Sequence, residues 1–407
     1  MKTNLLLLSF FFSTSIFAAC SVSPEPLPND EDETETPLTD IGSGEINGYK
    51  VVWEDKFNDG TLDETNRWSV EVNGNGGGNS ELQYYRRENI SVGTEPVSGA
   101  GCLIITAKKE SFSGKTCTSG RLTTQNKMTV KYGKIEARIK LPKTANGLWP
   151  AFWMLGADIT TYGWPKCGET DILEMGNANG IKNNTQEKYF NGACHWGESW
   201  NNGSYPNYAK ATTNAYSLQD DFHLYTLIWD ETAIKMYLDL DKYPNNTPYY
   251  EMAINGEDVA GNPRRYFHKQ GFVIFNLAVG GNFPQIWDIT KITALAAGDA
   301  KMYVDFIKVY QKGATGEELN SKVKTALPSV SATTKQFEIY PVPANGYLKI
   351  KGEATPAIVN IYSMNGQQLI SQKNTNQLAV TDLQSGNYTV QIIDINGKSE
   401  THTFIKK

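Results

Sequence analysis

The sequence has few of the features that would indicate a helical protein, a metal-stabilised protein or a nucleic-acid-binding protein. Its 407 residues contain only five cysteines and four histidines, and their spacing matches no zinc-site pattern. Apolar residues seldom recur at helical spacing, which argues against helical bundles and against helical crossovers between strands. Lysine and arginine form no cluster, so the basic patch that nucleic-acid binding requires is missing.

Basic residues are absent from one long stretch, and acidic residues gather there. Residues 21–49 hold eight acidic residues and no lysine or arginine, whereas residues 50–407 carry 37 basic and 36 acidic residues. The net charge of -6 therefore belongs almost entirely to this stretch. Its acidic, proline- and threonine-rich composition predicts a disordered tether over residues 21–48.

The apolar run at the N-terminus is too short and too interrupted to span a membrane. Lys2 precedes this run, and the small residues Ala18 and Ala19 follow it. This pattern predicts an export signal over residues 1–20. The Ala-Ala-Cys ending also resembles a bacterial lipoprotein cleavage site, so lipidation of Cys20 and simple cleavage both stay open.

Whether Cys20 is lipidated or is cleaved off with the export signal, four cysteines remain available for pairing. An exported protein would permit disulfides. We expect Cys102 to pair with Cys117, and Cys167 to pair with Cys194. The alternative is four buried thiols.

The sequence is rich in aromatic residues and in alternating segments. All nine tryptophans lie between Trp53 and Trp287, and there are 21 tyrosines, a composition suited to flat surfaces that stack on sugar rings. Alternating segments separated by glycine, asparagine and proline turns predict an all-β chain, best fitted by a β-jelly-roll sandwich of two antiparallel sheets with one concave face. The strands expected in this body cover residues 102–108, 132–141, 151–155, 223–229, 234–239, 271–279 and 302–310.

A change of composition divides the chain after the last tryptophan. The tryptophan-bearing body is expected over residues 49–312, and the polar stretch 313–335 predicts a linker. Residues 336–407 form a separate set of short alternating segments. Turns at Asn365-Gly366 and Asn396-Gly397 are strong hairpin signals, so this part predicts a small β-sandwich.

The candidate chemistry lies in residues 149–176, which hold three tryptophans and an acidic segment. Side chains alternate along a strand, so Glu169 and Asp171 share one face while Glu174 falls on the other. A β-bulge around Ile172-Leu173 would return Glu174 to the first face. Carboxylates on a half-buried strand are costly unless they have a role.

Two carboxylates on one face are the minimum for cleaving a glycosidic bond, one as an ionised nucleophile and one as a proton donor. Their close placement favours the shorter separation of a retaining enzyme. Two alternatives are a solvated edge strand and a calcium cage, although the Asp/Asn/Gly loop pattern of a calcium cage is absent.

An ordered set of motifs runs through the body: ELQYY at 81–85, YGKIEAR at 132–138, WPAFWML at 149–155, GETDILE at 168–174 and NLAVGG at 276–281. Together they resemble glycoside hydrolase family 16, laminarinase-type, over residues 49–312. The resemblance implies a β-jelly roll and retaining endo-hydrolysis. It also implies the roles of three acids: Glu169 as nucleophile, Asp171 as assisting acid and Glu174 as general acid/base. Thr170 departs from the aliphatic residue usual in the family.

The same resemblance implies binding residues around these acids. Six side chains are implied to contact the sugar: Trp149, Trp153, Trp164, Asn79, Arg121 and His195. For each tryptophan a place in the core is the alternative. One structural calcium ion is also implied, held by the side chain of Asp305 and by backbone carbonyls near Glu54 and Gly101. No cofactor is implied for the chemistry itself.

The last part of the chain has its own resemblance, in IYPVPANG at 339–346, IYSMNG at 361–366 and LQSGNY at 383–388. These segments resemble a type IX secretion sorting domain, with Val342 in place of the usual asparagine. The resemblance implies recognition by that secretion machinery and a secreted or outer-membrane-surface location in a Gram-negative, Bacteroidetes-type bacterium. A carbohydrate-binding module is the alternative, but the segment has no tryptophan.

Taken with the composition, the two resemblances imply an exported, monomeric endo-β-1,3-glucanase that acts on laminarin-like polysaccharide, with no nucleic-acid partner. Mixed-linkage β-1,3-1,4-glucan is the alternative substrate within the same fold. A non-catalytic glucan-binding protein is the alternative from another class, and the intact acidic trio speaks against it.

Overall fold

The computed structural model describes residues 48–200, 204–323, 337–352, 356–363, 368–395 and 399–407. The expected export signal, Cys20 and residues 21–47 of the expected tether lie outside the described residues, and so do the two Asn-Gly turns of the last part of the chain. In the described ranges, no helix is long and apolar enough to cross a membrane.

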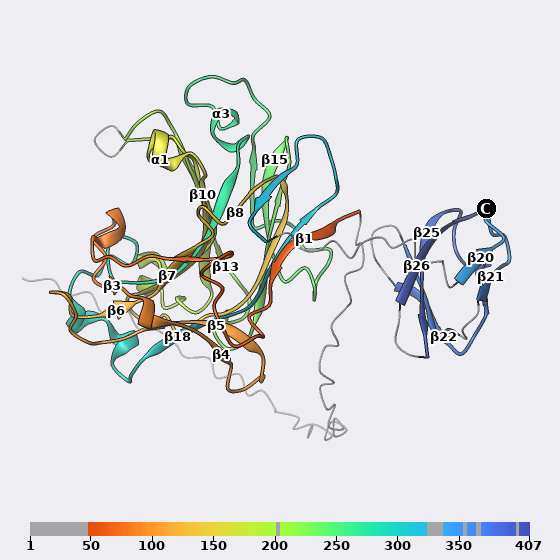
Figure 1. Ribbon diagram of the computed structural model, residues 1–407, viewed down its shortest axis with the longest axis horizontal. Coiled ribbons are helices and arrows are strands. Elements are labelled where there is room, and N and C mark those ends of the chain that lie inside the picture. The colour runs from red at the N-terminus through yellow and green to blue at the C-terminus, as the bar shows by residue number, and fades with distance from the viewer. Residues whose placement is uncertain (1–47, 201–203, 324–336, 353–355, 364–367, 396–398) are drawn as a thin grey trace, which may run out of the picture. The chain divides into compact units, whose positions relative to one another are not determined.

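Two antiparallel sheets build the larger domain (Figure 1). In sheet order, the first contains β16 (Tyr250–Ala253), β15 (Ala233–Leu238), β14 (His223–Trp229), β9 (Gly133–Lys140), β18 (Ala300–Gln311), β5 (Gly101–Ala107) and β4 (Ile90–Thr94), with β1 (Lys50–Asp55) beside β18. The second contains β13 (Asn207–Thr213), β12 (Tyr189–His195), β11 (Glu169–Met175), β10 (Leu148–Gly156), β17 (Gly271–Val279), β7 (Arg121–Thr123) and β2 (Ser69–Val70), with β8 (Met128–Lys131) beside β17. The predicted jelly-roll sandwich is confirmed.

Short elements connect these strands. A two-stranded parallel pair joins β3 (Tyr84–Tyr85) to β6 (Thr118–Ser119). The α-helices in the described part of the chain are all short: α1 (Ile159–Tyr162), α2 (Ala178–Lys182) and α3 (Arg264–Phe267). The 3-10 turns are η1 (Gly76–Gly78), η2 (Arg87–Asn89), η3 (Ile289–Lys291) and η4 (Thr293–Leu295). The scarcity of helical periodicity in the sequence agrees with these short helices.

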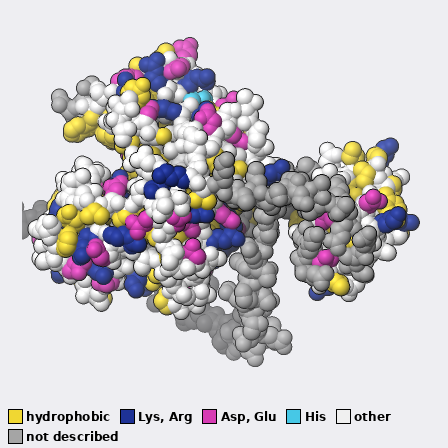
Figure 2. Space-filling view, in the orientation of Figure 1, with side chains coloured by type: hydrophobic (Ala, Val, Ile, Leu, Met, Phe, Trp, Pro, Cys, Tyr) yellow, Lys and Arg dark blue, Asp and Glu magenta, His cyan; other side chains and the backbone are white. Residues whose placement is uncertain are grey.

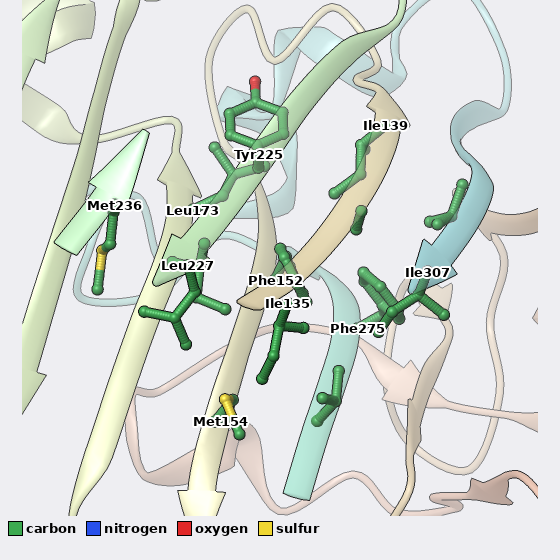
Figure 3. Packing of buried hydrophobic residues seen from close by; sticks show 14 of the residues in the cluster. Ile135, Ile139, Phe152, Met154, Leu173, Tyr225, Leu227, Met236, Phe275 and Ile307 are labelled. Atoms are coloured by element: carbon green, nitrogen blue, oxygen red, sulfur yellow. The ribbon is translucent and has the colours of Figure 1, made fainter. Parts of the chain in front are cut away.

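One large apolar core is built from the inner faces of the two sheets (Figure 3). Ile135 of β9 and Leu227 of β14 come from the first sheet, and both are buried. Phe152 of β10 and Phe275 of β17 come from the second sheet, where they pair directly and their rings stack at 4.9 Å. Burying side chains of this size contributes roughly 1.5–3 kcal/mol each, so this core fixes the second sheet as a rigid support for its other face.

The β-bulge predicted in β11 is confirmed. Opposite β10, Asp171 pairs with Trp153 and Leu173 pairs with Phe152, so Ile172 is an extra residue. The pairing with β12 shifts at the same place, between Asp171 and Glu174. Ile172 and Leu173 are both fully buried in the core, and the extra residue thereby returns Glu174 to the outer face.

The larger domain extends beyond the expected boundary at residue 312. β19 (Glu318–Ser321) pairs with β8 inside the stretch that the sequence assigned to a linker. Gln311 Nε2 donates to the Glu318 carbonyl (3.0 Å), and Asn320 Nδ2 donates to Gln270 Oε1 (2.9 Å). Strands are predicted from alternating apolar residues, and an edge strand that is held by polar contacts lacks this alternation. The composition of β19 therefore resembled that of a linker.

The expected disulfides are not formed, because all four cysteines of the described residues are buried free thiols. Cys102 lies in a small cluster with Ile104, whereas Cys117 belongs to the main core. Cys167 and Cys194 are likewise in different apolar clusters. Burial raises the pKa of all four thiols to about 12, so they remain protonated. The alternative of four buried thiols is confirmed.

The C-terminal part is a small β-sandwich, as predicted. One sheet contains β20 (Phe337–Tyr340), β21 (Tyr347–Gly352) and β24 (Gln377–Ala379), and the other contains β23 (Gln368–Lys373), β22 (Pro356–Ser363), β25 (Gly386–Asp394) and β26 (Ser399–Lys406). Apolar residues from both sheets, including Phe337, Leu348, Val359 and Phe404, form a separate core.

Charged side chains of both signs are interspersed over the visible face of the molecule (Figure 2). Ion pairs are frequent among the described residues, for example Lys235 with Glu251 (2.9 Å) and Arg265 with Asp258 (3.0 Å). Such exposed pairs contribute little to stability. Their mixture of signs agrees with the near-neutral composition of residues 50–407.

Candidate active site

Strand pairing brings the predicted acids and the predicted histidine to one face of the second sheet. Glu169 pairs directly with His195 across β11 and β12, and directly paired residues project to the same face. Alternation adds Asp171 on β11, and the bulge adds Glu174. This face points away from the core, because Ile172 between these acids is buried inside it. The structure therefore assembles all three acids beside His195.

Each glutamate of the trio accepts a hydrogen bond from a tryptophan. Trp164 Nε1 donates to Glu169 Oε2 (2.9 Å), and Trp149 Nε1 donates to Glu174 Oε1 (3.0 Å). Their position next to the acids agrees with the sequence analysis, although this use of the indole nitrogens was not foreseen. Contact between these rings and a sugar stays a prediction.

Asn191 is a site residue that the sequence analysis missed. Its Nδ2 donates to Glu174 Oε2 (3.1 Å), and its side chain is buried. It lies four residues before His195 on β12, so alternation along that strand from the predicted histidine could have identified it.

Burial raises the pKa of all three carboxyl groups. For Glu169 burial, followed by the charge of Asp171, raises the pKa to about 8. Burial raises the pKa of Asp171 to about 8, and burial followed by the charge of Asp171 raises the pKa of Glu174 well above its usual value. The trio therefore holds at least one proton at neutral pH.

The environment separates Glu169 from the other two acids. His195, Trp164 and Arg121 each lower the pKa of Glu169, and His195 and Trp149 likewise lower the pKa of Glu174, so in both groups the effect of burial is partly opposed. Glu169 is also partly exposed, whereas Asp171 and Glu174 are buried. Because Glu169 reaches solvent while Glu174 is buried, Glu169 is the better placed of the two to ionise and Glu174 the better placed to keep a proton.

Two of the predicted tryptophans have one ring face covered. Trp149 stacks on Phe283 with ring centroids 4.7 Å apart and an angle of 12° between the planes. The guanidinium of Arg121 lies over the Trp153 ring, 4.8 Å from its centroid, while Arg121 Nε contacts Glu71 Oε1 at 2.9 Å. Each of these rings has at most one face left for a sugar, and Arg121 supports Trp153 as well as being a candidate sugar contact.

A buried chain of hydrogen bonds begins at the indole N–H of Trp153 and holds this side chain in place. The sequence analysis missed this chain as well. Trp153 Nε1 donates to Asn276 Oδ1 (2.7 Å). Asn276 Nδ2 donates to the Tyr85 hydroxyl (3.3 Å), which donates to Glu81 Oε2 (2.9 Å). The signal in the sequence was a single polar residue, Asn276, in the apolar run 271–279, because a buried amide needs partners.

Asn79 lies at a junction between two loops. Its carbonyl accepts from the Asn282 backbone N–H (2.8 Å), and its side-chain amide contacts the Gly77 carbonyl (3.4 Å). A Cβ on Gly281, where φ is +95°, would lie 2.7 Å from the Asn79 carbonyl, so glycine is required there. The structure gives Asn79 a role in joining the loops, and its contact with sugar stays a prediction.

The residues expected to bind calcium face arginine side chains. Asp305 Oδ2 lies 2.8 Å from Arg138 Nη1, and the Glu54 carbonyl accepts a hydrogen bond from Arg67. Gly101 packs against another segment, since a Cβ there would lie 3.0 Å from the Phe57 carbonyl. Two of the three expected ligands already contact a guanidinium, whose charge would repel a divalent cation. This arrangement does not fit a calcium ion.

Comparisons with known proteins assign both domains. Residues 84–253 match glycosyl hydrolases family 16, and residues 338–407 match the secretion system C-terminal sorting domain. The second match confirms the expected sorting domain and, with it, a secreted or cell-surface location.

Individual relatives agree with the first match. The β-glucanase of Rhodothermus marinus is 33% identical over 270 residues, which cover 65% of this chain and 85% of the relative. Glucan endo-1,3-beta-glucosidase A1 of Niallia circulans is 32% identical over 308 residues, 70% of this chain and 41% of the relative. The chain also matches the clotting factor G alpha subunit of Tachypleus tridentatus, of which it spans 35%.

The structural comparison leads to the same family. A Bacteroides ovatus mixed linkage glucan GH16 protein, solved in complex with a G4G4G3G product, is 38% identical with a TM-score of 0.55. The alignment covers 63% of this chain and 99% of that one. The acids, the fold and these matches together show that the chain belongs to glycosyl hydrolase family 16.

Proposed function

We propose that the protein is a retaining endo-glycosidase that hydrolyses β-1,3-glucan of the laminarin type. The observation that carries the proposal is the bulge at Ile172, which brings Glu174 to the face of Glu169 and Asp171. Two carboxyl groups in unlike environments are what a double displacement at an anomeric carbon requires.

Glu169 is the nucleophile in this proposal. Its anion attacks the anomeric carbon, and it is supported by the N–H of Trp164 and by the nearby Arg121 and His195. The resulting glycosyl–enzyme ester is later cleaved by water, which restores the Glu169 carboxylate.

Glu174 is the general acid and then the general base. Burial keeps its proton available for the departing glycosidic oxygen. After that transfer Trp149 and Asn191 each donate a hydrogen bond to one oxygen of the remaining carboxylate. The carboxylate can then take a proton from the attacking water.

The names of the relatives bear on the substrate. The Niallia circulans relative is named as an endo-1,3-β-glucosidase, which supports β-1,3-glucan. The Bacteroides ovatus structure holds a product of mixed-linkage glucan and is 38% identical to this chain. This second observation makes mixed-linkage β-1,3-1,4-glucan the alternative substrate.

Release of reducing ends from purified laminarin and from mixed-linkage β-glucan tests the proposal. We expect Glu169→Ser to abolish release and Glu174→Gln to lower it by about 10²–10⁴-fold. The matched control Glu251→Gln, on β16 and paired with Lys235, should leave release unchanged. Wild-type rates from Glu169→Ser would overturn the nucleophile assignment. NMR of the first-formed product should show the β-anomer, and an α-anomer would refute retention.

We further propose that residues 338–407 deliver the enzyme to the secretion machinery. The match to a sorting domain supports this step. Deletion of these residues should leave active enzyme inside the producing cell, whereas the complete chain should reach the medium or the surface. Equal export of both forms would refute the proposal.

A further inference from the structure

Glu169, Asp171 and His195 form the one group of three metal-ligating side chains found within the described part of the chain. One donor atom from each lies within 4.8 Å of the other two. His195 Nε2 and Asp171 Oδ2 are 3.3 Å apart. The three therefore surround a common point on the face that also carries Glu174.

Asp171 supplies a second, independent observation. The residue is only 4% exposed, and its Oδ2 atom has no hydrogen-bond partner within the described ranges. A buried carboxylate oxygen without a donor is costly, and a cation at this point would satisfy it. The 3.3 Å contact with His195 brings the two atoms close without the geometry of a hydrogen bond.

The spacing fits a small transition-metal ion. Zinc binds histidine nitrogen and carboxylate oxygen at about 2.0–2.2 Å in tetrahedral geometry, which places two ligands of one ion roughly 3.3–3.5 Å apart. The Asp171–His195 separation of 3.3 Å already matches this value. One oxygen of Glu169 already lies within 4.8 Å of a donor atom of each of these two residues, so a small side-chain movement would complete the set of ligands.

We propose that Glu169, Asp171 and His195 bind one divalent transition-metal ion, with Zn²⁺ as the prototype, and that this ion excludes the glucan. Three protein ligands leave one position open, as in zinc sites that exchange their fourth ligand. The bound ion occupies the carboxylate that would otherwise attack the sugar. This second effect rests on the proposed function, whereas metal binding does not.

The ligand set also indicates which ions bind and how firmly. An imidazole nitrogen with only two carboxylates suits Zn²⁺ or Cu²⁺, whereas Ca²⁺ requires six to eight oxygen ligands. Zinc-binding histidines usually donate their other ring N–H to a partner. His195 Nδ1 has no such partner within the described residues. Binding is therefore reversible and weaker than in a structural zinc site.

Calorimetric titration of the complete chain with ZnCl₂ tests the metal site. We expect one Zn²⁺ per chain, an affinity at least about tenfold lower in His195→Gln and in Asp171→Asn, and no binding of CaCl₂. The control is His402→Gln in the C-terminal sandwich, where His402 contacts Glu400 at 2.7 Å. The site is overturned if His195→Gln binds Zn²⁺ like the wild type, or if binding is lost in His402→Gln instead.

Spectra and competition separate the two parts of the proposal. Co²⁺ should give visible absorption bands of a nitrogen- and oxygen-coordinated ion with the wild type and not with His195→Gln, and equal spectra would refute the site. The Glu174→Gln variant keeps all three ligands and turns over laminarin only slowly, so laminarin should weaken its Zn²⁺ affinity. Unchanged affinity would refute exclusion of the glucan. If this variant does not bind laminarin at all, the proposed function fails, while the wild-type titration still decides the metal site.

Discussion

Trp164 Nε1 lies 2.9 Å from Glu169 Oε2, and this contact joins a loop to the acidic strand. The Trp164 ring packs edge-on against Tyr205, whose ring also lies 5.6 Å from that of His195. A tryptophan expected to stack on sugar therefore holds a reacting carboxylate. Stacking and hydrogen bonding use different parts of the ring, so one residue can do both.

Replacement of this indole by a phenyl ring isolates the hydrogen bond. We expect Trp164→Phe to lower kcat on laminarin by about 10- to 150-fold, because a hydrogen bond to a charged group contributes roughly 1.5–3 kcal/mol. The pKa of Glu169 should rise further, which moves the acidic limb of the kcat/KM profile to higher pH. Trp287→Phe is the control, since Trp287 donates to Asn282 and not to an acid. A loss confined to KM would contradict the role assigned to the N–H group.

The buried acids make stability depend on pH. The folded-state pKa of Asp171, about 8, lies above its ordinary value of 3.8, so the folded chain retains a proton that the unfolded chain releases. The stabilisation is present below about pH 4 and is lost as the pH rises towards 8. Asparagine does not ionise. We therefore expect Asp171→Asn to be more stable than the wild type by about 1–3 kcal/mol at pH 8 and equal to it near pH 4.

Urea unfolding at pH 4, 6 and 8 measures this difference. Glu251→Gln on β16 serves as control, because Glu251 is exposed and paired with Lys235. An Asp171→Asn effect that stays the same at all three pH values would show that burial of the charge is not its cause.

The chain of hydrogen bonds behind Trp153 should act as a unit. Asn276→Ala leaves the indole N–H without its acceptor, at a cost of about 1–3 kcal/mol in unfolding free energy. Tyr85→Phe removes the next link, since Tyr85 joins Asn276 to Glu81. We expect the double variant to lose clearly less than the sum of the single losses. Additive losses in a denaturant series would show that the two links are independent.

We expect calcium to have no effect on stability, because arginine side chains already contact Asp305 and the Glu54 carbonyl. We expect EDTA and CaCl₂ to leave the unfolding temperature unchanged. Arg138→Met should lower stability by about 1 kcal/mol, because Asp305 loses its cationic partner. A calcium-dependent rise in unfolding temperature that disappears in Asp305→Asn would restore the calcium site implied by the sequence resemblance.

Local sequence patterns were sufficient to predict the fold and the acidic trio. Strands such as β14 and β17 follow from apolar segments bounded by turn residues, and both have the expected limits. The bulge was predictable because Glu169, Asp171 and Glu174 violate simple alternation in a segment that otherwise has every mark of a strand.

Contacts between distant segments could not be predicted in the same way. The hydrogen bond from Trp164 to Glu169 depends on how a loop folds back on a strand, and sequence spacing does not determine this. The free thiols of Cys102 and Cys117 depend on which apolar cluster each side chain enters. The arginine contacts of Glu54 and Asp305 involve residues 13 and 167 positions away, beyond the reach of any local pattern.

Because β11 contains an extra residue, the face on which each of its later side chains lies depends on the number of residues in the strand and not only on their types. Deleting Ile172 would reverse the parity of everything that follows it, so that Glu174 would turn inward and Met175 outward. A single-codon deletion would thus place a carboxylate among the core side chains while every catalytic residue type remained in the sequence. Transfer of this trio to another sandwich protein therefore means transferring an odd-numbered insertion together with the side chains.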